Sequence, residues 1–398
     1  MTMVAQDQRV TVGLLATCQA LSMTGTSLLV TVAALTGDML TTDKSLATLP
    51  VALQFVGTMS ATIPASLLMA RIGRRAGFSL GQVIGAIGAA LSIYAIVIGS
   101  FWLLCGGAFL LGAHNAFWQY LRFAAADGAT PEFRPKAISY VMVGGVLAAI
   151  AGPALSVLAK DALAPFNFAG SYAVIVVVCI MTIAVLQAVR IPKLTAEQRR
   201  DTGRPLSKIA RQPAFVVAVI SSGMGYGVMI LVMTATPLAM IACGYTFEHS
   251  TMVIMSHAVG MFLPSFFTGH LINRFGVLRV IMTGAVLSAC CMAIALAGIE
   301  LANFWFALVI LGVGWNFLFV GGTTLLTQSY TPSERAKTQA AHDFVVFTFA
   351  TLASFSAGML HAGSGWSAVN AAVAIPVLFA FSAALWLLMA ERRRKSLI

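Results

Sequence analysis

The chain has 398 residues, of which only 9% are charged and 59% are hydrophobic, with a net charge of +11. A soluble domain carries about 25% charged residues, so this composition excludes a soluble globular protein. The apolar residues form long continuous runs, which indicates helices that cross a bilayer rather than the strands of a membrane barrel.

Twelve apolar stretches are each long enough to cross a bilayer as a helix. The first follows Arg9 and is itself long enough to span, so we expect no cleavable signal peptide. The predicted fold class is therefore all-α integral membrane. The predicted spans are 10–36, 45–70, 77–99, 101–124, 137–159, 168–189, 213–236, 248–272, 277–298, 303–325, 338–360 and 366–389.

The basic residues are unequally divided between the two sides of these spans. With both termini in the cytoplasm, all 24 Lys and Arg residues except Lys44 and Lys160 lie on the cytoplasmic side. This asymmetry is the positive-inside rule. The positive net charge therefore reflects membrane topology, and we expect no nucleic-acid partner. The predicted location is a bacterial cell inner membrane, crossed many times.

The two halves of the chain repeat each other. Residues 191–212 form a polar, basic linker between residues 1–190 and residues 213–398, and each half holds six predicted spans. The loop TPEFRPKA at 130–137 matches TPSERAKT at 331–338. Parallel repeats of this kind are typical of transporters whose solute site lies between the halves near the midplane. Helices 4 and 10 also match, with Gly112, Asn115 and Phe117 against Gly312, Asn316 and Phe317.

A second pair of matched loops follows helices 2 and 8. At these residues the chain resembles the major facilitator superfamily over essentially its whole length. The resemblance implies two pseudo-symmetric six-helix bundles with gate loops that contain Arg71, Arg74, Arg134, Arg274 and Arg335. The family motif G-x-L-x-D-R-x-G-R-R corresponds to Ser66, Leu68, Ala70, Arg71, Gly73, Arg74 and Arg75, and to Gly269, Leu271, Asn273, Arg274, Gly276 and Arg279. The acid of the motif is absent from both copies. In the family this acid helps to hold the cytoplasmic gate closed, so its absence predicts a gate that is held closed less strongly.

The fourth predicted span carries a polar stripe. Asn115, Gln119 and Arg122 are spaced by four and three residues, so they share one face of a helix. A polar stripe in a membrane helix is costly unless it faces a protein interior or a watery cavity. We predict a cavity, with hydrogen bonding between helices as the alternative. Asn115 and Gln119 are assigned to the solute site. Arg122 and Asp127 resemble the R-x-x-x-x-D element that ends the family's helix 4, and they are assigned to the gate or to proton coupling.

Among the thirteen acidic residues, only Asp343 lies clearly inside a predicted span. Ion coupling usually needs a titratable group within the membrane, so Asp343, preceded by His342, is the candidate for proton coupling. The alternative is a gate residue that caps helix 11 or pairs with a basic loop. The chain has no phosphate-binding G-x-x-x-x-G-K-[ST] motif and no convergent nucleophile and base. We therefore expect no enzymatic activity, no cofactor and no metal site.

The candidate solute-binding residues are mostly aromatic or neutral, which suits a flat, partly aromatic solute better than a sugar or a phosphate. The helix 4 end RFAAAD and residues 256–276 are similar to a bacterial branch of the family that includes riboflavin-type vitamin importers. This resemblance implies a riboflavin- or pterin/antifolate-like solute. We also expect alternating access, protons as the coupling ion, and a monomer. The candidates are Gln19, Gln54, Asn115, Phe117, Trp118, Gln119, Tyr226, His257, Trp315, Asn316 and Phe319.

Two other functions fit parts of the pattern. Gly144, Gly145, Gly152 and Pro153 in the fifth span partly match the antiporter motif of drug exporters, which favours a multidrug/proton antiporter. The same small residues also suit close helix packing. A membrane receptor or sensor that binds the solute without moving it is the alternative from another class. The matched gate loops favour transport, because a sensor needs no pair of gates.

Overall fold

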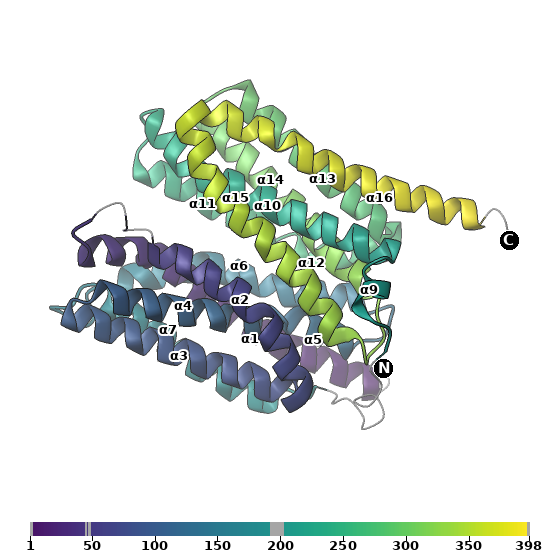
Figure 1. The fold of residues 1–398 in the computed structure, drawn as a ribbon, viewed down its shortest axis with the longest axis horizontal. Helices are drawn as coiled ribbons and strands as arrows, with labels where there is room; N and C mark the ends of the chain where they lie inside the picture. The colour runs from purple at the N-terminus through teal and green to yellow at the C-terminus, as the bar shows by residue number, and fades with distance from the viewer. Residues whose placement is uncertain (1–2, 44–45, 47–48, 192–202, 396–398) are drawn as a thin grey trace. The chain divides into compact units, whose positions relative to one another are not determined.

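The computed structural model describes residues 3–43, 46, 49–191 and 203–395. This part of the chain is helical and contains no strand. Twelve of its helices are long and apolar enough to cross a membrane, which confirms the predicted fold class. Lys44 and residues 192–202 of the predicted linker lie outside the described residues. Helix labels follow Figure 1.

The chain divides into two compact units. Unit 1 comprises Met1–Gly128 and Val141–Glu197, and unit 2 comprises Ala129–Tyr140 and Gln198–Ile398. The helices of unit 1 are α1 (Met3–Leu40), α2 (Leu49–Ile72), α3 (Arg74–Ile98), α4 (Phe101–Trp118), α5 (Leu121–Asp127), most of α6 (Arg134–Ala159) and α7 (Ala169–Ala188). The helices of unit 2 are α9 (Leu206–Ile209), α10 (Pro213–Ala242), α11 (Phe247–Phe262), α12 (Ser265–Phe275), α13 (Val277–Ala297), α14 (Leu301–Leu326), α15 (Arg335–Ala372) and α16 (Ala374–Lys395).

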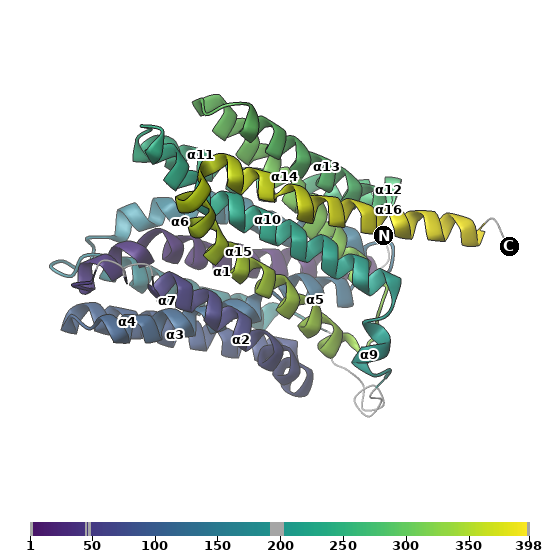
Figure 2. The ribbon, with the colours of Figure 1, turned by 45° about the horizontal axis from the view of Figure 1, so that its top comes forward.

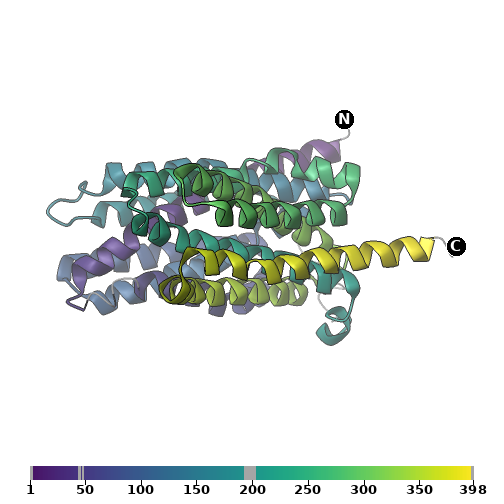
Figure 3. The ribbon, with the colours of Figure 1, turned by 90° about the horizontal axis from the view of Figure 1, so that it is seen from above.

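The same packing order recurs inside each unit, as the sequence repeat predicts. In unit 1, α4 packs against α2 and α3, and α7 packs against α1 and α3. In unit 2, α14 packs against α11 and α13, and α16 packs against α10 and α13. Figure 2 shows α10 and α15 running alongside each other in unit 2. We call the end of unit 2 that carries residues 203–212 the linker end; α9 and the C-terminal end of α16 both lie there (Figure 3).

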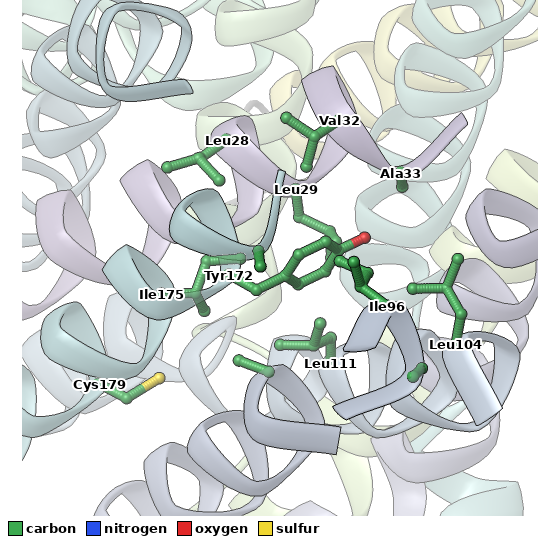
Figure 4. Close-up of a cluster of buried hydrophobic side chains, with 13 residues drawn as sticks. Leu28, Leu29, Val32, Ala33, Ile96, Leu104, Leu111, Tyr172, Ile175 and Cys179 are labelled. Carbon is green, nitrogen blue, oxygen red and sulfur yellow. The ribbon is translucent and has the colours of Figure 1, made fainter. Parts of the chain in front are cut away.

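A buried apolar cluster from α1, α3, α4 and α7 forms the core of unit 1 (Figure 4). Leu29 and Val32 of α1 meet Ile96 of α3, Leu104 of α4 and Tyr172 of α7. These side chains are at most 6% exposed. In a membrane the bilayer does not drive such helices together, so close packing of side chains stabilises the bundle.

Glycines set the closest helix crossings in both units. A Cβ on Gly112 would overlap the Gln54 carbonyl of α2, and a Cβ on Gly312 would lie 2.6 Å from the His257 carbonyl of α11. These two glycines are the matched pair that the repeat identified. A Cβ on Gly144 would lie 2.7 Å from the Ala16 carbonyl of α1. The close approach of α6 to α1 therefore explains why a glycine occupies position 144. The other explanation considered for this glycine was an antiporter motif.

We expect Gly112→Ala to lower the unfolding midpoint of the detergent-solubilised chain. The added methyl group overpacks the crossing of α2 and α4, at a cost of about 1–3 kcal/mol. Gly106→Ala in the same helix is the matched control, because the nearest atom to its Cβ is Leu91 Cδ2 at 3.8 Å. That control should be neutral or stabilising by up to about 1 kcal/mol, since alanine favours a helix more than glycine does. Equal midpoints for the two variants would contradict the tight crossing.

The glycine of each matched gate loop has a positive φ. Gly73 has φ 90° and ψ 153°, and Gly276 has φ 89° and ψ 148°. Each precedes the first residue of a helix, α3 or α13. A Cβ at either position would meet nothing within 4 Å, so the backbone conformation, and not lack of space, explains the glycine.

Residues 129–140 belong to unit 2 because they pack tightly against α12. Ser139 Oγ donates to the Ser265 carbonyl at 2.5 Å and accepts from the Gly269 amide at 3.1 Å. Asn273 Nδ2 donates to the Glu132 carbonyl at 2.8 Å. Asn273 stands where the family motif has an acid. An amide can donate to a carbonyl and a carboxylate cannot, so this replacement suits the contact with residue 132.

Two predicted spans are broken in the structure. The span predicted at 101–124 is interrupted at Gln119 and Tyr120, and the span predicted at 248–272 is interrupted at Leu263 and Pro264. Proline lacks the amide that continues a helix, which explains the second break. The first break is stabilised by a side chain: the Gln119 carbonyl accepts a hydrogen bond from Arg122 Nη1 at 2.6 Å.

Candidate functional site

The polar side chains predicted on the fourth span form two sets of hydrogen bonds inside unit 1. Asn115 Nδ2 donates to Thr58 Oγ1 at 3.2 Å, and Thr58 donates to the Gly112 carbonyl at 3.0 Å. Arg122 Nη1 also contacts Gln119 Oε1 at 3.1 Å. Asn115 lies on α4 and Arg122 on α5, so the break at Gln119 and Tyr120 interrupts the predicted stripe. Arg122 is 1% exposed and lies 4.5 Å from the Phe123 ring, so its guanidinium is held within the bundle.

Four amide oxygens of unit 1 have no hydrogen-bond partner among the described residues. They are Gln19 Oε1, Gln54 Oε1, Gln82 Oε1 and Asn115 Oδ1, and each residue is at most 8% exposed. A buried acceptor without a partner costs about 1–3 kcal/mol. Such acceptors are suited to receive hydrogen bonds from a ligand that carries hydroxyl or amide donors.

Asn316 of α14 differs from its counterpart Asn115. Its Nδ2 donates to the Met261 carbonyl and to Ser265 Oγ, both at 2.6 Å, and its Oδ1 accepts from Thr268 at 2.7 Å. The side chain is fully buried. Because its hydrogen bonds go to α11 and α12, Asn316 holds this broken helix against α14. This arrangement favours helix-to-helix bonding for Asn316 over the predicted role in binding solute.

The remaining candidates are buried at several points of the bundles. Phe117 packs against the position of Gly81 in α3, and Trp118 is 4% exposed. His257 is fully buried, with Nδ1 2.7 Å from the Leu308 carbonyl. Its Nε2 has no partner among the described residues.

Unit 2 contains an aromatic cluster. Tyr226 of α10 lies edge-on to Trp315, Phe319 and Phe347, with ring centroids 5.6–5.7 Å apart. Trp315 and Phe319 stack at 4.9 Å, and Phe262 lies edge-on to Trp315 at 5.6 Å. Four of these rings are buried, whereas Tyr226 is half-buried.

The sequence predicted three members of this aromatic cluster and missed Phe262 and Phe347. The spacing of Phe347 gave a usable signal, because it follows Asp343 by four residues and therefore shares its helix face. Phe262 ends α11 just before the break at Leu263 and Pro264. Only the fold brings it to Trp315.

His342 and Asp343 form a buried pair one helical turn from Phe347. His342 Nδ1 lies 2.8 Å from Asp343 Oδ1, and both side chains are fully buried. Asp343 is the ninth residue of α15, about two turns into the helix. The imidazole and the carboxylate are thus within hydrogen-bonding distance of each other inside the bundle.

Asp127 pairs with Arg74. Arg74 Nη2 lies 2.7 Å from Asp127 Oδ2, and the two side chains are 6% and 8% exposed. The contact ties the start of α3 to the end of α5. Asp127 is the acid of the R-x-x-x-x-D element, and it pairs with Arg74 of the loop that follows helix 2 in the same unit. Of the other arginines predicted to belong to gate loops, Arg71 and Arg274 are exposed, and Arg134 and Arg335 are half-buried.

Asp127→Asn is expected to lower the free energy of unfolding by about 3 kcal/mol. The substitution removes the carboxylate charge from the buried contact between Asp127 and Arg74. Asp161→Asn is the matched control, because Asp161 and Lys160 form an exposed pair at 3.8 Å. An exposed pair contributes about 0–1 kcal/mol. Thermal unfolding of the two variants checks the difference, and equal losses would contradict the importance of the buried pair.

Arg204, near the end of the linker, forms hydrogen bonds and an ion pair with Glu334. The sequence did not predict this contact. The Arg204 amide and its Nε each donate to Glu334 Oε1, and Nη2 donates to Oε2, all at 2.7 Å. A Cβ on Gly203 would meet Glu334. In the matched loop of the first half, Phe133 stands in place of Glu334. The linker therefore anchors to the second copy of this loop through a residue that differs between the repeats.

The stability from this contact should depend on pH. The hydrogen bonds from Arg204 hold the pKa of Glu334 well below its usual range. A lowered pKa means that the stabilisation is complete above the ordinary glutamate pKa of about 4.3 and is lost as the pH falls further. We expect Glu334→Gln to lower the unfolding midpoint at pH 7 and to matter less towards pH 3. A difference that stays constant over this range would contradict the assignment.

Together, the fold and these clusters define a membrane protein of two repeated helical bundles with buried polar and aromatic groups. The chain belongs to the Major Facilitator Superfamily: the family model matches residues 15–264 and 244–398. The chain is thus a transporter of this family.

Related proteins and structures agree with this family. The chain is 40% identical to the riboflavin transporter RfnT of Brucella anthropi over 359 residues, which is 90% of each chain. It is 30% identical to the uncharacterized transporter YdeG of Bacillus subtilis, over 90% of this chain and 87% of that one. The fold is similar to the transporter FucP, at 17% identity and a TM-score of 0.75, over 96% of this chain and 99% of that chain. It is also similar to the human organic anion transporter MFSD10, at 12% identity and a TM-score of 0.76, over 95% and 99% of the two chains.

Proposed function

We propose that this transporter carries a flat heteroaromatic solute of the riboflavin type across the membrane by alternating access, with protons as the coupling ion. The observation that carries the proposal is the 40% identity to a riboflavin transporter over 90% of both chains. A pterin-like solute shares the same flat ring chemistry and is the nearest alternative substrate.

The aromatic cluster of unit 2 supports a flat ring as the bound group. Tyr226 is its half-buried member and lies edge-on to three buried rings. These neighbours hold Tyr226 in a fixed orientation, and a flat solute ring can stack on it with little loss of side-chain freedom. A sugar would need several polar partners, and the members of this cluster are all aromatic.

The unpartnered acceptors of unit 1 support a solute that also carries hydroxyl donors. Gln19, Gln54 and Asn115 each offer an amide oxygen. The ribityl chain of riboflavin has several hydroxyl groups that donate to such acceptors. We assign these three residues to the solute path, and we assign Asn316 to helix packing instead.

Proton coupling is assigned to the pair of His342 and Asp343. Asp343 lies four residues before Phe347, so its carboxylate shares a helix face with the aromatic cluster. A change in the protonation of the pair therefore acts next to the proposed ring site. The position two turns into α15 favours coupling over a helix cap, because capping groups lie in the first turn.

The distribution of basic residues supports a proposal for the orientation in the membrane. We propose a bacterial inner membrane, with both termini and the linker end in the cytoplasm. Residues 191–212 connect the two six-helix bundles in the sequence. We expect a monomer with a small solute, protons and lipid as its partners, and with no enzymatic step. The gate role of Arg71, Arg134, Arg274 and Arg335 is part of this proposal.

Ligand-induced stabilisation of the purified chain tests the solute class. A ligand at one hundred times its Kd stabilises the folded state by about 2.7 kcal/mol. We expect riboflavin to raise the unfolding midpoint, and we expect ribitol and fucose at the same concentration to leave it unchanged. A rise with ribitol equal to that with riboflavin would contradict a site built for the ring.

Two other functions predict different results. A multidrug/proton antiporter would be stabilised by many unrelated cations and would extrude them, and a receptor would bind riboflavin without moving it. The contact with α1 accounts for Gly144, so the partial match to the antiporter motif is weaker support for efflux. Flux measurements in vesicles separate all three functions.

A further inference from the structure

A cavity of about 560 Å³ lies at the linker end of unit 2. Its walls come from the ends of α12, α13, α14 and α16, from Pro131 of the loop before α6, and from Pro135 in the first turn of α6. None of the residues assigned to solute binding or proton coupling lines it. The cavity is therefore distinct from the proposed solute site.

The sequence repeat explains why unit 2 has this cavity. At the matched positions of unit 1, Phe123 and the ion pair of Arg74 and Asp127 fill the space between the helix ends. In unit 2 the counterpart of Phe123 is Thr324. The counterparts of the ion pair are Val277 and Gln328. All three of these replacements line the cavity. Three uncharged side chains, of which Thr324 and Val277 are smaller than their counterparts, have thus replaced a filled, charge-paired contact.

The polar part of the wall suits a phosphate group. Arg279 and Arg392 place two guanidinium groups on it, against the single carboxylate of Glu391. Thr324 is 3% exposed, and its hydroxyl has no hydrogen-bond partner among the described residues. The start of α13 adds the positive end of a 21-residue helix with no side-chain cap. Arginine binds phosphate oxygens through paired N–H donors.

The apolar part of the wall suits hydrocarbon. Phe275, Leu278 and Leu388 lie beside the arginines. The cavity is also bounded by the ends of membrane-spanning helices, where lipid headgroups lie. A soluble phosphate ester would match the arginines but would leave these apolar side chains facing water.

We propose that this cavity binds the phosphodiester headgroup of an anionic lipid, with Arg279 and Arg392 on the phosphate and the apolar wall against the start of the acyl chains. Each basic residue near a membrane surface strengthens binding of an anionic lipid about fivefold. Removing both arginines should therefore weaken binding by roughly thirtyfold.

Native mass spectrometry of the full-length chain, with phosphatidylglycerol and phosphatidylcholine at equal concentration, tests the proposal. We expect retention of phosphatidylglycerol over phosphatidylcholine, and loss of this preference in the variant Arg279→Gln with Arg392→Gln. The matched control is Arg190→Gln with Arg211→Gln, which removes the same charge from exposed positions outside the cavity. The control should keep the preference.

A second variant transfers the filled contact of unit 1 into unit 2. Val277→Arg with Gln328→Asp introduces an ion pair at the matched positions, with no change in net charge, and should also abolish the preference. Equal retention of phosphatidylglycerol by the wild type and by the variant lacking both arginines would overturn the site. Stabilisation by sn-glycerol 3-phosphate as strong as that by phosphatidylglycerol would overturn the assignment to a lipid and indicate a soluble phosphate ester.

Discussion

Asp343→Asn is expected to abolish accumulation of solute driven by a pH gradient while leaving exchange of solute across the membrane intact. Accumulation requires a group that takes up a proton on one side and releases it on the other. Among the acids of the described chain, Asp343 is fully buried, hydrogen-bonded to His342, and placed on the helix face of Phe347. Exchange needs only that the loaded protein reorient, and a neutral side chain permits this.

Measuring both exchange and gradient-driven accumulation distinguishes a loss of proton coupling from a failure of the variant to fold. Proteoliposomes that contain Asp343→Asn should exchange labelled for unlabelled riboflavin at a rate near that of the wild type, and should show no gradient-driven accumulation. Asp161→Asn, an exposed acid outside the pair, is the control and should do both. Unchanged accumulation in Asp343→Asn would remove this residue from proton coupling and favour its reading as a gate residue.

Tyr226→Ala is expected to weaken riboflavin binding by roughly tenfold, because loss of one stacked aromatic contact costs about 1.5 kcal/mol. Tyr226→Phe keeps the ring and should bind nearly as well as the wild type. The quenching of riboflavin fluorescence on binding measures both values.

A tyrosine elsewhere in unit 2 provides the control for this experiment. Tyr245 follows the end of α10, and its hydroxyl donates to the Ile299 carbonyl at 3.2 Å, away from the aromatic cluster. Tyr245→Ala should leave the Kd for riboflavin unchanged. A loss of affinity in Tyr226→Ala no larger than in Tyr245→Ala would exclude the aromatic cluster from the solute site.

The arrangement of spans was predictable because the bilayer constrains it. An apolar stretch that must satisfy its own backbone becomes a helix, and the matched loops at 130–137 and 331–338 identified two repeats. The structure confirms the twelve helices and the fold. The prediction that Asn115, Gln119 and Arg122 share one face assumed an unbroken helix, whereas α4 ends at Trp118 and α5 begins at Leu121.

Other features depend on contacts that spacing does not encode. The break at Gln119 depends on a guanidinium that returns to a backbone carbonyl. Asn115 and Asn316 occupy matched positions, yet only Asn316 has partners on both amide atoms among the described residues. The ion pair of Arg204 and Glu334 joins residues that are 130 positions apart. One lies in the linker and the other in the loop at 331–338, and nothing in the sequence pattern links these two segments.

Transport of riboflavin by the purified chain is the most direct test of the proposed function. Proteoliposomes loaded with buffer should take up radiolabelled riboflavin above its equilibrium level when the lumen is made more alkaline than the medium, and a proton ionophore should collapse this accumulation. Unlabelled riboflavin should compete, and fucose should not. Riboflavin that binds the reconstituted protein but never enters the vesicles, with or without the gradient, would contradict the transport of this solute.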